Sequence, residues 1–234
     1  RMWFDRSYTP LMEFAVGWSF NFSYIKVIDV GWLYTESQAI TSDGARYTMY
    51  KNDIEDASKT EITLNYRSNA PKQHSMFKDK SYSYGGLTSA YRLEYKDGTK
   101  EYFDKDGILM KTENRFGDKI TYKYEKTGTE QSYGSVDHAS IYEKYNKVTI
   151  TDTCGRETVI ERTARKSEAV VSSEYYTGEY HEIIITLPSA DTDTEASTLT
   201  YKIKTVKNDN DPKNEGHYLY FQILDSITER DGSK

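Results

Sequence analysis

The sequence predicts an all-β fold in which short antiparallel strands follow one another as a meander of hairpins. Three turn glycines, Gly98, Gly107 and Gly117, lie nine and ten residues apart. The runs around them, such as residues 91–95 and 120–124, alternate apolar with polar side chains, which is the period of a strand with one buried face. Tyrosine supplies 22 residues against 8 Phe and 3 Trp, and its amphipathic ring suits a thin sheet wetted on one side.

The Asp-Gly pairs at residues 97–98 and 106–107 are the expected turns of this meander. A two-residue hairpin turn needs positive φ, which glycine adopts without Cβ strain and aspartate tolerates through local hydrogen bonds. We therefore expect two-residue turns, with Gly98, Gly107 and Gly117 at positive φ.

Residues 1–90 form an aromatic-rich opening segment of what we expect to be a single all-β region over residues 1–234. Alternating aromatic side chains over residues 18–24 predict a half-buried strand that ends near Asp29.

Three tryptophans, Trp3, Trp18 and Trp32, lie in this opening segment. Exposed, they would form a platform on which sugars stack. Buried, they would form an aromatic core that seals one end of the sheet, which is the commoner use of such rings. Both interpretations stay open from the sequence.

The rest of the opening segment contains a hairpin over residues 34–50, around the turn Asp43-Gly44, and a strand over residues 61–66. Residues 67–81 have no strand or helix period, and Pro71 blocks regular pairing, so a loop is expected there.

Residues 91–234 carry the repeated pattern, interrupted by a Gly-, Ser- and Glu-rich insertion at residues 126–146. Residues 163–177 are the only segment that favours a helix. The apolar run within residues 181–187 predicts a strand buried on both faces. Further strands are expected at the ranges 199–206 and 218–223.

Two segments resemble units of the bacterial YD-repeat (Rhs) family. Residues 115–124, RFGDKITYKY, are similar to its R-x-G-N-x-I-x-Y-x-Y unit, with Asp118 where Asn is commoner. Residues 150–156, ITDTCGR, resemble its I-T-D-x-x-G-R unit, which makes Gly155 a further turn glycine. Residues 17–21, GWSFN, are similar to the segment that opens the repeat core.

The resemblance implies a structural role. In that family the strands pair into a long β-ribbon that spirals into a hollow shell, and the shell commonly encloses a C-terminal toxin domain. The expected partner is then the remainder of the same polypeptide, and the expected location is secreted or on the cell surface. Residues 226–232, with Gly232 as a turn glycine, look like the opening of another unit, so we expect a fragment of a longer protein.

Composition argues against several other classes. The net charge is −6, and the basic residues are interleaved with acidic ones, which disfavours nucleic acid as a partner. Cys154 is the only cysteine, so no intrachain disulfide can form. The sequence has no run of about eighteen apolar residues, the length of a membrane span, and its first residues show no signal-peptide pattern.

No catalytic motif is present, and we expect neither an enzyme nor a cofactor. The four histidines are His74, His138, His181 and His217, and their spacing matches no metal-site motif. Cys154 lies at a turn rather than in a nucleophile motif. Two acidic loops, residues 191–195 and 208–211, could gather a calcium ion, although turn chemistry alone accounts for such residues.

The main alternative function is a cell-surface carbohydrate-binding module that uses exposed Tyr and Trp rings, and a third is a glycoside-active enzyme. The direction of the rings separates these hypotheses. A cleft of exposed aromatic rings would favour glycan binding, whereas a Tyr-lined concave sheet face would favour the shell.

Overall fold

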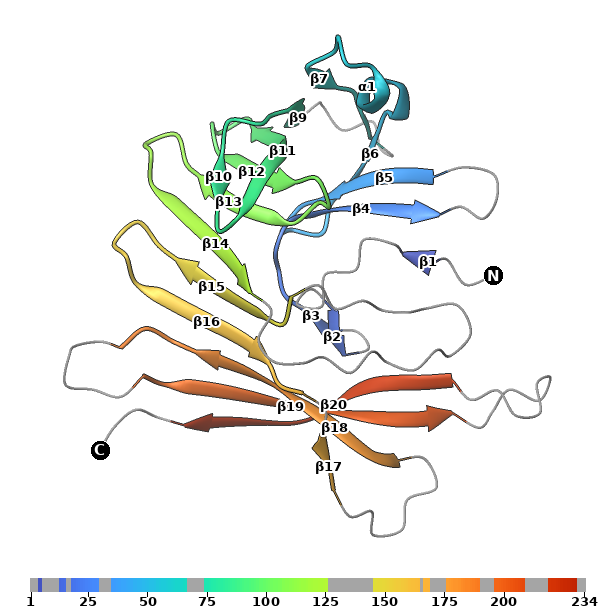
Figure 1. The fold of residues 1–234 in the computed structure, drawn as a ribbon, viewed down its shortest axis with the longest axis vertical. Helices are drawn as coiled ribbons and strands as arrows, with labels where there is room; N and C mark the ends of the chain where they lie inside the picture. The colour runs from blue at the N-terminus through green and yellow to red at the C-terminus, as the bar shows by residue number, and fades with distance from the viewer. Residues whose placement is uncertain are drawn as a thin grey trace.

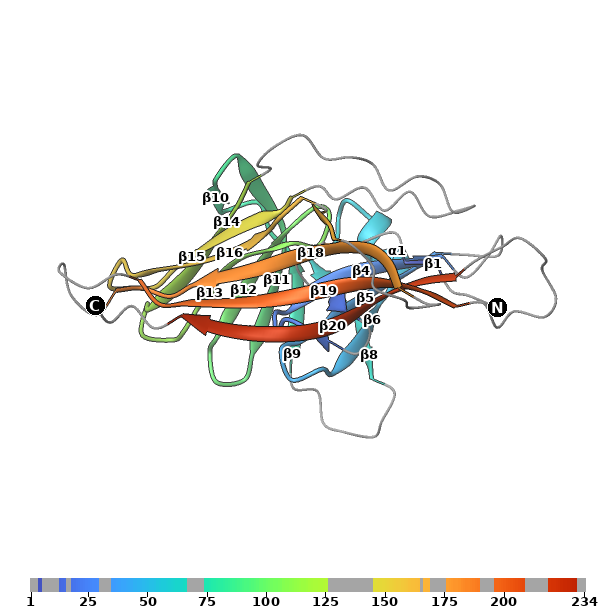
Figure 2. The same cartoon turned by 90° about the horizontal axis from the view of Figure 1, so that it is seen from below.

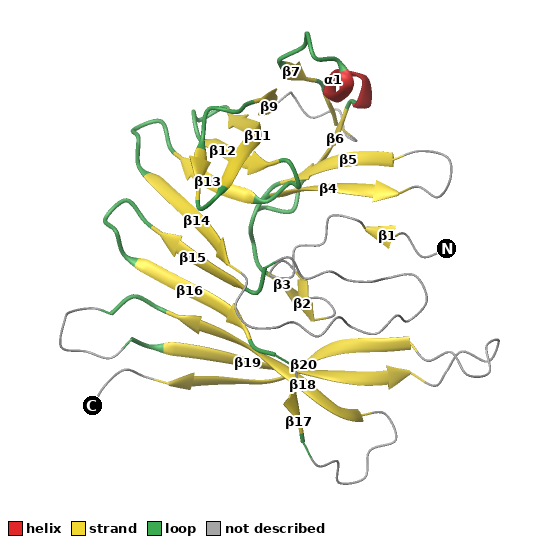
Figure 3. Cartoon of the chain, viewed as in Figure 1, coloured by secondary structure: helices red, strands yellow, loops and turns green. Residues whose placement is uncertain are grey.

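The computed structural model describes residues 4–5, 13–15, 18–29, 35–66, 74–125, 145–164, 166–168, 176–189, 196–208 and 219–230. These residues form antiparallel sheets, and the five-residue α1 (Lys51–Glu55) is the only helix among them (Figure 3). The predicted all-β fold is confirmed.

The larger sheet has thirteen strands, and we call it the ribbon. Its strands are β7 (Glu61–Ile62), β9 (His74–Lys78), β10 (Ser83–Tyr84), β11 (Leu87–Tyr95), β12 (Lys100–Asp104), β13 (Leu109–Glu113), β14 (Lys119–Glu125), β15 (Lys147–Thr151), β16 (Glu157–Arg162), β17 (Lys166–Ser167), β18 (Tyr176–Thr186), β19 (Thr198–Asn208) and β20 (Leu219–Arg230). From β11 to β20 each strand pairs with the next along the chain, apart from β17, which pairs only with β18. The predicted meander is confirmed (Figure 1).

A second sheet of five strands, which we call the N-terminal sheet, lies beside the upper part of the ribbon (Figure 1). It contains β1 (Phe4–Asp5), β4 (Tyr24–Asp29), β5 (Thr35–Ile40), β6 (Arg46–Met49) and β8 (Leu64–Tyr66), in that order. A short pair, β2 (Glu13–Ala15) and β3 (Trp18–Ser19), forms a third sheet. Seen from below, β18, β19 and β20 run the length of the molecule (Figure 2).

One hydrophobic core joins the ribbon to the N-terminal sheet. It combines residues of the N-terminal sheet, among them Ile25 and Met49, with residues of the ribbon, among them Met76, Leu93 and Phe103. Because the two sheets bury side chains against each other, neither sheet has its full core without the other.

The predicted strand over residues 61–66 is instead two strands in different sheets. Ile62 pairs with Met76 in the ribbon, whereas Leu64 pairs with Met49 in the N-terminal sheet. Both Ile62 and Leu64 are buried, so the chain turns the corner between the sheets while keeping the same side inward.

The predicted strand over residues 18–24 is also interrupted. β3 ends at Ser19 and β4 begins at Tyr24. The rings of Phe20 and Phe22 stack between them, with centroids 5.7 Å apart, and the Phe22 ring packs edge-on against Tyr122 of the ribbon. Packing of these rings against the ribbon thus replaces strand pairing here.

Two other local expectations were wrong. The expected loop at residues 67–81 contains β9, whose Met76 is fully buried and which pairs with β11. The expected helix at residues 163–177 contains β17 and the start of β18, and β17 pairs with a later part of β18, Lys166 with Tyr180. In both places pairing with another strand overrides the local propensity.

The C-terminal strands also differ from expectation. In β18, Ile183 is fully buried, but Ile184 and Ile185 are only partly buried, so the strand is not buried on both faces. β20 continues to Arg230, so the strand expected at residues 218–223 is longer and includes residues 226–230, which pair with β19. That these residues open another unit stays a prediction. Gly232 lies outside the described residues.

Candidate functional site

The turn glycines of the meander all have the predicted backbone conformation. Gly98, Gly107, Gly117 and Gly155 have φ of 88°, 82°, 92° and 81°. The loops, however, have three residues rather than two. The N–H of Gly98 donates to the Tyr95 carbonyl at 3.0 Å, and the N–H of Tyr95 donates to the Thr99 carbonyl at 2.8 Å, which is a tight turn followed by a glycine bulge.

In three of these four turns a side-chain oxygen three positions before the glycine also closes the loop, whereas the Gly98 turn has Tyr95 at that position. Asp104 Oδ1 accepts hydrogen bonds from the backbone N–H groups of Asp106 and Ile108, at 2.9 and 2.8 Å. Asn114 and Asp152 make the same pair of bonds in the next two glycine turns. An Asx residue three positions before the glycine therefore closes each of these turns from the inside.

The two segments that resemble YD-repeat units have the same turn geometry. The turns within residues 114–118 and 152–156 have the same hydrogen bonds, and they lie next to each other, because Thr153 Oγ1 accepts from the Lys119 N–H at 2.7 Å. The Asx-x-x-Gly spacing is the sequence signal for the Gly107, Gly117 and Gly155 turns, whereas the Asp-Gly pair marks only the Gly98 and Gly107 turns of the four.

Gly107 differs from the other turn glycines because its turn contacts the N-terminal sheet. Its carbonyl accepts a hydrogen bond from the Ile25 N–H at 2.9 Å. A Cβ atom on Gly107 would lie 2.0 Å from the Ile25 carbonyl oxygen, whereas a Cβ on Gly117 or Gly155 would meet nothing within 4 Å. Only glycine fits where the two sheets meet.

A buried carboxyl group lies at the same junction. Glu101, on β12, is only 6% exposed. Tyr95 Oη donates a hydrogen bond to its Oε2 at 2.7 Å, and Ser23 Oγ donates to its Oε1 at 3.0 Å. Ser23 Oγ in turn accepts from the Ser42 N–H at 3.0 Å, so these bonds join the ribbon to the N-terminal sheet.

Burial dominates the electrostatics of this cluster. It raises the pKa of the Glu101 carboxyl, and the hydrogen bonds from Tyr95 and Ser23 offset part of that rise. Burial and the neighbouring Glu101 raise the pKa of Tyr95 well above its usual value. Burial lowers the pKa of His74, whose ring packs edge-on against Tyr95 with centroids 4.5 Å apart. These hydrogen bonds and ring contacts lie at the junction between the ribbon and the N-terminal sheet.

Sequence reasoning did not single out Ser23 or Glu101. Glu101 shares strand parity with Phe103, but Tyr102, on the opposite face, is buried as well, so alternation gives no signal for Glu101. Ser23 lies between strands and has no local signal either.

Most aromatic rings whose burial the structure describes are partly exposed, and five are buried. Tyr47, Tyr102, Tyr122, Tyr124 and Phe103 are buried. Trp3 and Trp32 lie outside the described residues, and so does the side chain of Trp18, so glycan stacking by the tryptophans stays a prediction.

Two exposed rings lie far apart along the chain. Tyr50 is 53% exposed just before α1, and Phe116 is 75% exposed in the turn between β13 and β14. Among the rings whose burial the structure describes, these two are the only strongly exposed ones, and they lie next to strands of different sheets.

Tyr82 and Tyr102 hold a lysine between their rings. Lys111 Nζ lies 4.5 Å from the centroid of Tyr82 and 4.1 Å from that of Tyr102, and 2.6 Å from Glu113 Oε2. The pair of rings and the carboxylate satisfy the lysine, and Tyr84 on β10 stacks beside Tyr82. This group covers the ribbon rather than opening a binding surface.

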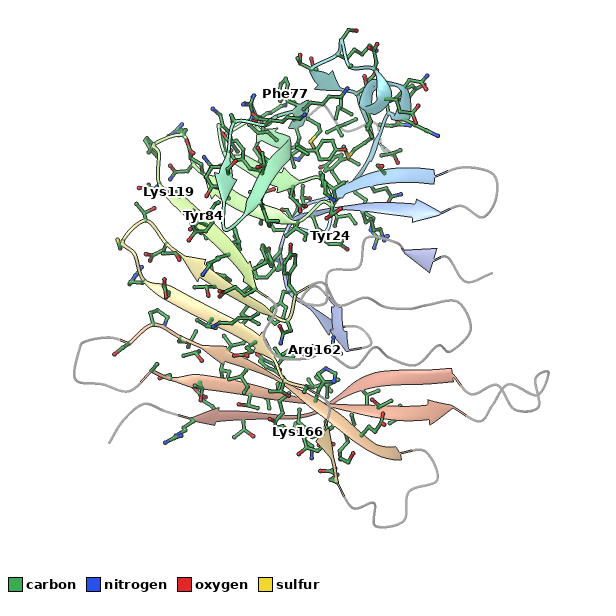
Figure 4. All side chains as sticks on the ribbon, viewed as in Figure 1. Tyr24, Phe77, Tyr84, Lys119, Arg162 and Lys166 are labelled. Atoms are coloured by element: carbon green, nitrogen blue, oxygen red, sulfur yellow. The ribbon has the colours of Figure 1, made fainter. Side chains whose placement is uncertain are left out.

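Charged side chains are mostly paired along the rest of the ribbon. Lys202 Nζ lies 2.5 Å from Glu168 Oε2, and Lys166 Nζ lies 2.5 Å from Glu182 Oε2. Lys119 and Lys166 lie at the outside of the molecule, whereas Arg162, at the end of β16, is buried at its centre (Figure 4).

Catalytic and metal-binding candidates do not come together. In the part of the chain that the structure describes, no group of three or more His, Cys, Asp or Glu side chains could hold a metal ion. His181 is buried, and Cys154 is exposed in the β15–β16 turn. Residues 191–195 and 209–211 lie outside the described ranges, so calcium binding there stays untested.

No protein-family model, curated protein or solved structure matches the chain. None of the helical residues that the structure describes forms a helix long and apolar enough to cross a membrane.

Proposed function

We propose that this chain is a structural segment of a bacterial YD-repeat-type shell wall that encloses or presents a C-terminal toxin domain. The observation that carries the proposal is the run of strands from β11 to β20 in sequence order, with one turn geometry repeated in it. A meander of this kind lengthens by adding hairpins at its last strand, which is what a continuous wall requires.

The edge of the ribbon supports this role. Ile183, Tyr201 and Ile227 are neighbours on adjacent strands, so they form one row across β18, β19 and β20. Ile183 is fully buried, Tyr201 is half-buried, and Ile227 is 52% exposed. The exposure of this apolar row therefore increases towards the edge strand β20, where one more paired strand would help to cover Ile227.

The partner in this proposal is the remainder of the same polypeptide, which supplies further repeats and the enclosed domain. The proposed location is secreted or at the cell surface. Of the tyrosines whose burial the structure describes, only Tyr50 is strongly exposed and the others are buried or half-buried. This distribution favours the wall over a carbohydrate-binding module, because such a module needs several rings exposed on one face.

Glycan arrays and polysaccharide hydrolase assays test the proposal against its alternatives. We expect no saturable glycan binding and no hydrolysis by the chain. Tight, saturable binding of one glycan would replace the wall with the binding module, and hydrolysis would replace it with a glycoside-active enzyme.

Electron microscopy of the full-length polypeptide tests the wall directly. A hollow particle is the expected result, since a curling ribbon encloses space and removes its own edges. A solid or extended particle would overturn the proposal.

A further inference from the structure

We infer that Ser23, Glu101 and Tyr95 form a pH-sensitive latch, which holds the N-terminal sheet on the ribbon more tightly as the pH falls. The latch is a property of the junction between the two sheets and is independent of the proposed shell.

The geometry places the latch where the sheets meet. Ser23 lies two residues before Ile25, whose N–H donates to the Gly107 carbonyl at 2.9 Å. Glu101 lies on β12, which leads into the Gly107 turn. Opening the junction would break the Ser23–Glu101 and Ile25–Gly107 hydrogen bonds and expose the Glu101 carboxyl to water.

The charge state of Glu101 decides how costly its burial is. An ionised carboxylate only accepts hydrogen bonds, and two hydroxyl donors are too few to replace its hydration. Burial accordingly raises the pKa of Glu101 in the closed junction, while in the open junction its pKa returns towards 4.5. Closing therefore takes up a proton, so the closed state gains stability as the pH falls through the raised pKa.

Four other titratable groups face Glu101 or its partners. Asp43, from the β5–β6 turn, is a like charge that raises the pKa of Glu101 further, and Tyr95 and Tyr122 stay neutral because burial raises their pKa values. His74, on β9, works in the opposite direction. Burial lowers its pKa, so its contribution to the closed state is lost as the pH falls below about 6.5.

Glu101 and His74 change the stability of the closed junction in opposite directions as the pH falls. The test therefore compares the wild type with a Glu101 variant at each pH, since the contribution of His74 is common to both. Amide hydrogen exchange, corrected for intrinsic rates, gives the protection of the Ile25 N–H in the wild type and in Glu101→Gln. This variant keeps the shape of the side chain but cannot ionise. Glu113→Gln, on β13, is the matched control, because Glu113 lies outside the junction and pairs with Lys111.

Protection of Ile25 in the wild type, relative to Glu101→Gln, should rise as the pH falls towards 4.5, by up to about tenfold per pH unit. At the Val148 amide, in the central strand β15, the ratio of protection between the wild type and Glu101→Gln should not change with pH. The ratio of protection between the wild type and Glu113→Gln should not change with pH at either the Ile25 or the Val148 amide. A wild-type to Glu101→Gln ratio at Ile25 that does not change with pH would overturn the latch.

Ser23→Ala provides a second test that does not depend on opening. The Ser23 hydroxyl lowers the pKa of Glu101, so its removal should move the titration of the Glu101 carboxyl carbon, followed by NMR, to higher pH. A titration that is unchanged or moves to lower pH would show that Ser23 does not act on Glu101.

Discussion

At the scale of single residues, glycines with the same backbone conformation have different neighbours. Gly107 and Gly117 have φ of 82° and 92°. Successive turns of an antiparallel meander lie at opposite edges, so the β12–β13 turn reaches the N-terminal sheet and the β13–β14 turn does not. Gly107 therefore serves both its hairpin and the junction.

Alanine substitution separates these two roles. Gly117→Ala should lower the free energy of unfolding by about 1–2 kcal/mol, the cost of an L-residue in the left-handed region. Gly107→Ala should cost about 1–3 kcal/mol more, because its Cβ displaces the Ile25 carbonyl. Urea denaturation of both variants measures the difference. Equal losses would show that the sheets do not meet at this turn.

At the scale of elements, short strands depend on side chains from their neighbours. β10 has only two residues, and it pairs with β11 through Ser83 and Tyr84. The Lys111 side chain, held between Tyr82 and Tyr102, supplies a contact that the short ladder lacks. Cation–π attraction thus holds β10 on the ribbon.

Lys111→Met tests this contact by keeping the length of the side chain and removing its charge. We expect a loss of about 0.5–2 kcal/mol in the free energy of unfolding. The Ser89 N–H, which donates to the Tyr82 carbonyl at 2.8 Å, should exchange faster. Lys202→Met is the matched control, because Lys202, on β19, lies 4.2 Å from the centroid of the Tyr180 ring and pairs with Glu168, away from β10. Equal exchange at Ser89 in the two variants would contradict the role of Lys111.

At the scale of the whole molecule, the ribbon has an edge strand with an exposed apolar residue. β20 is the last strand in the order of the ribbon, and Ile227 lies on it. The β-bulge at Asp225, where the register with β19 shifts, and the charges of Glu229 and Arg230 moderate pairing at this edge. Of residues 223–230, whose burial the structure describes, all except Leu224 are exposed.

The chain should therefore self-associate through β20 as its concentration rises. Size-exclusion chromatography with light scattering over a concentration series measures this. Ile227→Lys should reduce association, because a lysine on an edge strand disfavours pairing. Ile120→Lys should not, since Ile120 is 39% exposed but lies on the central strand β14. A wild-type chain that stays monomeric, or equal effects of both variants, would contradict an open edge at β20.

Local sequence patterns predicted the strands and turns of the ribbon well, because these features depend on residues only a few positions apart. Alternation from Tyr91 to Tyr124 assigned the strands, and the glycines marked the turns. The predictions for residues 61–66, 67–81 and 163–177 were wrong, because distant partners decide the structure there. β9 forms against β11, and Ile62 and Leu64 join different sheets.

The candidate site was predicted only in part. Sequence patterns identified turn glycines, but they treated Gly107 as equivalent to Gly98 and Gly117. Glu101 lies on a strand with both faces buried, and its partner Ser23 lies 78 residues away along the chain. No local period connects residues at such a separation, so their pairing was not predictable.

The order of residues therefore sets the hairpins, the buried faces of most strands and the positive-φ turns, since the hydrogen bonds of each turn close within five residues. The packing of the N-terminal sheet on the ribbon, the tight fit at Gly107 and the burial of Glu101 depend on the tertiary structure. These features arise from contacts between segments far apart along the chain, and they form only when folding brings the two sheets together.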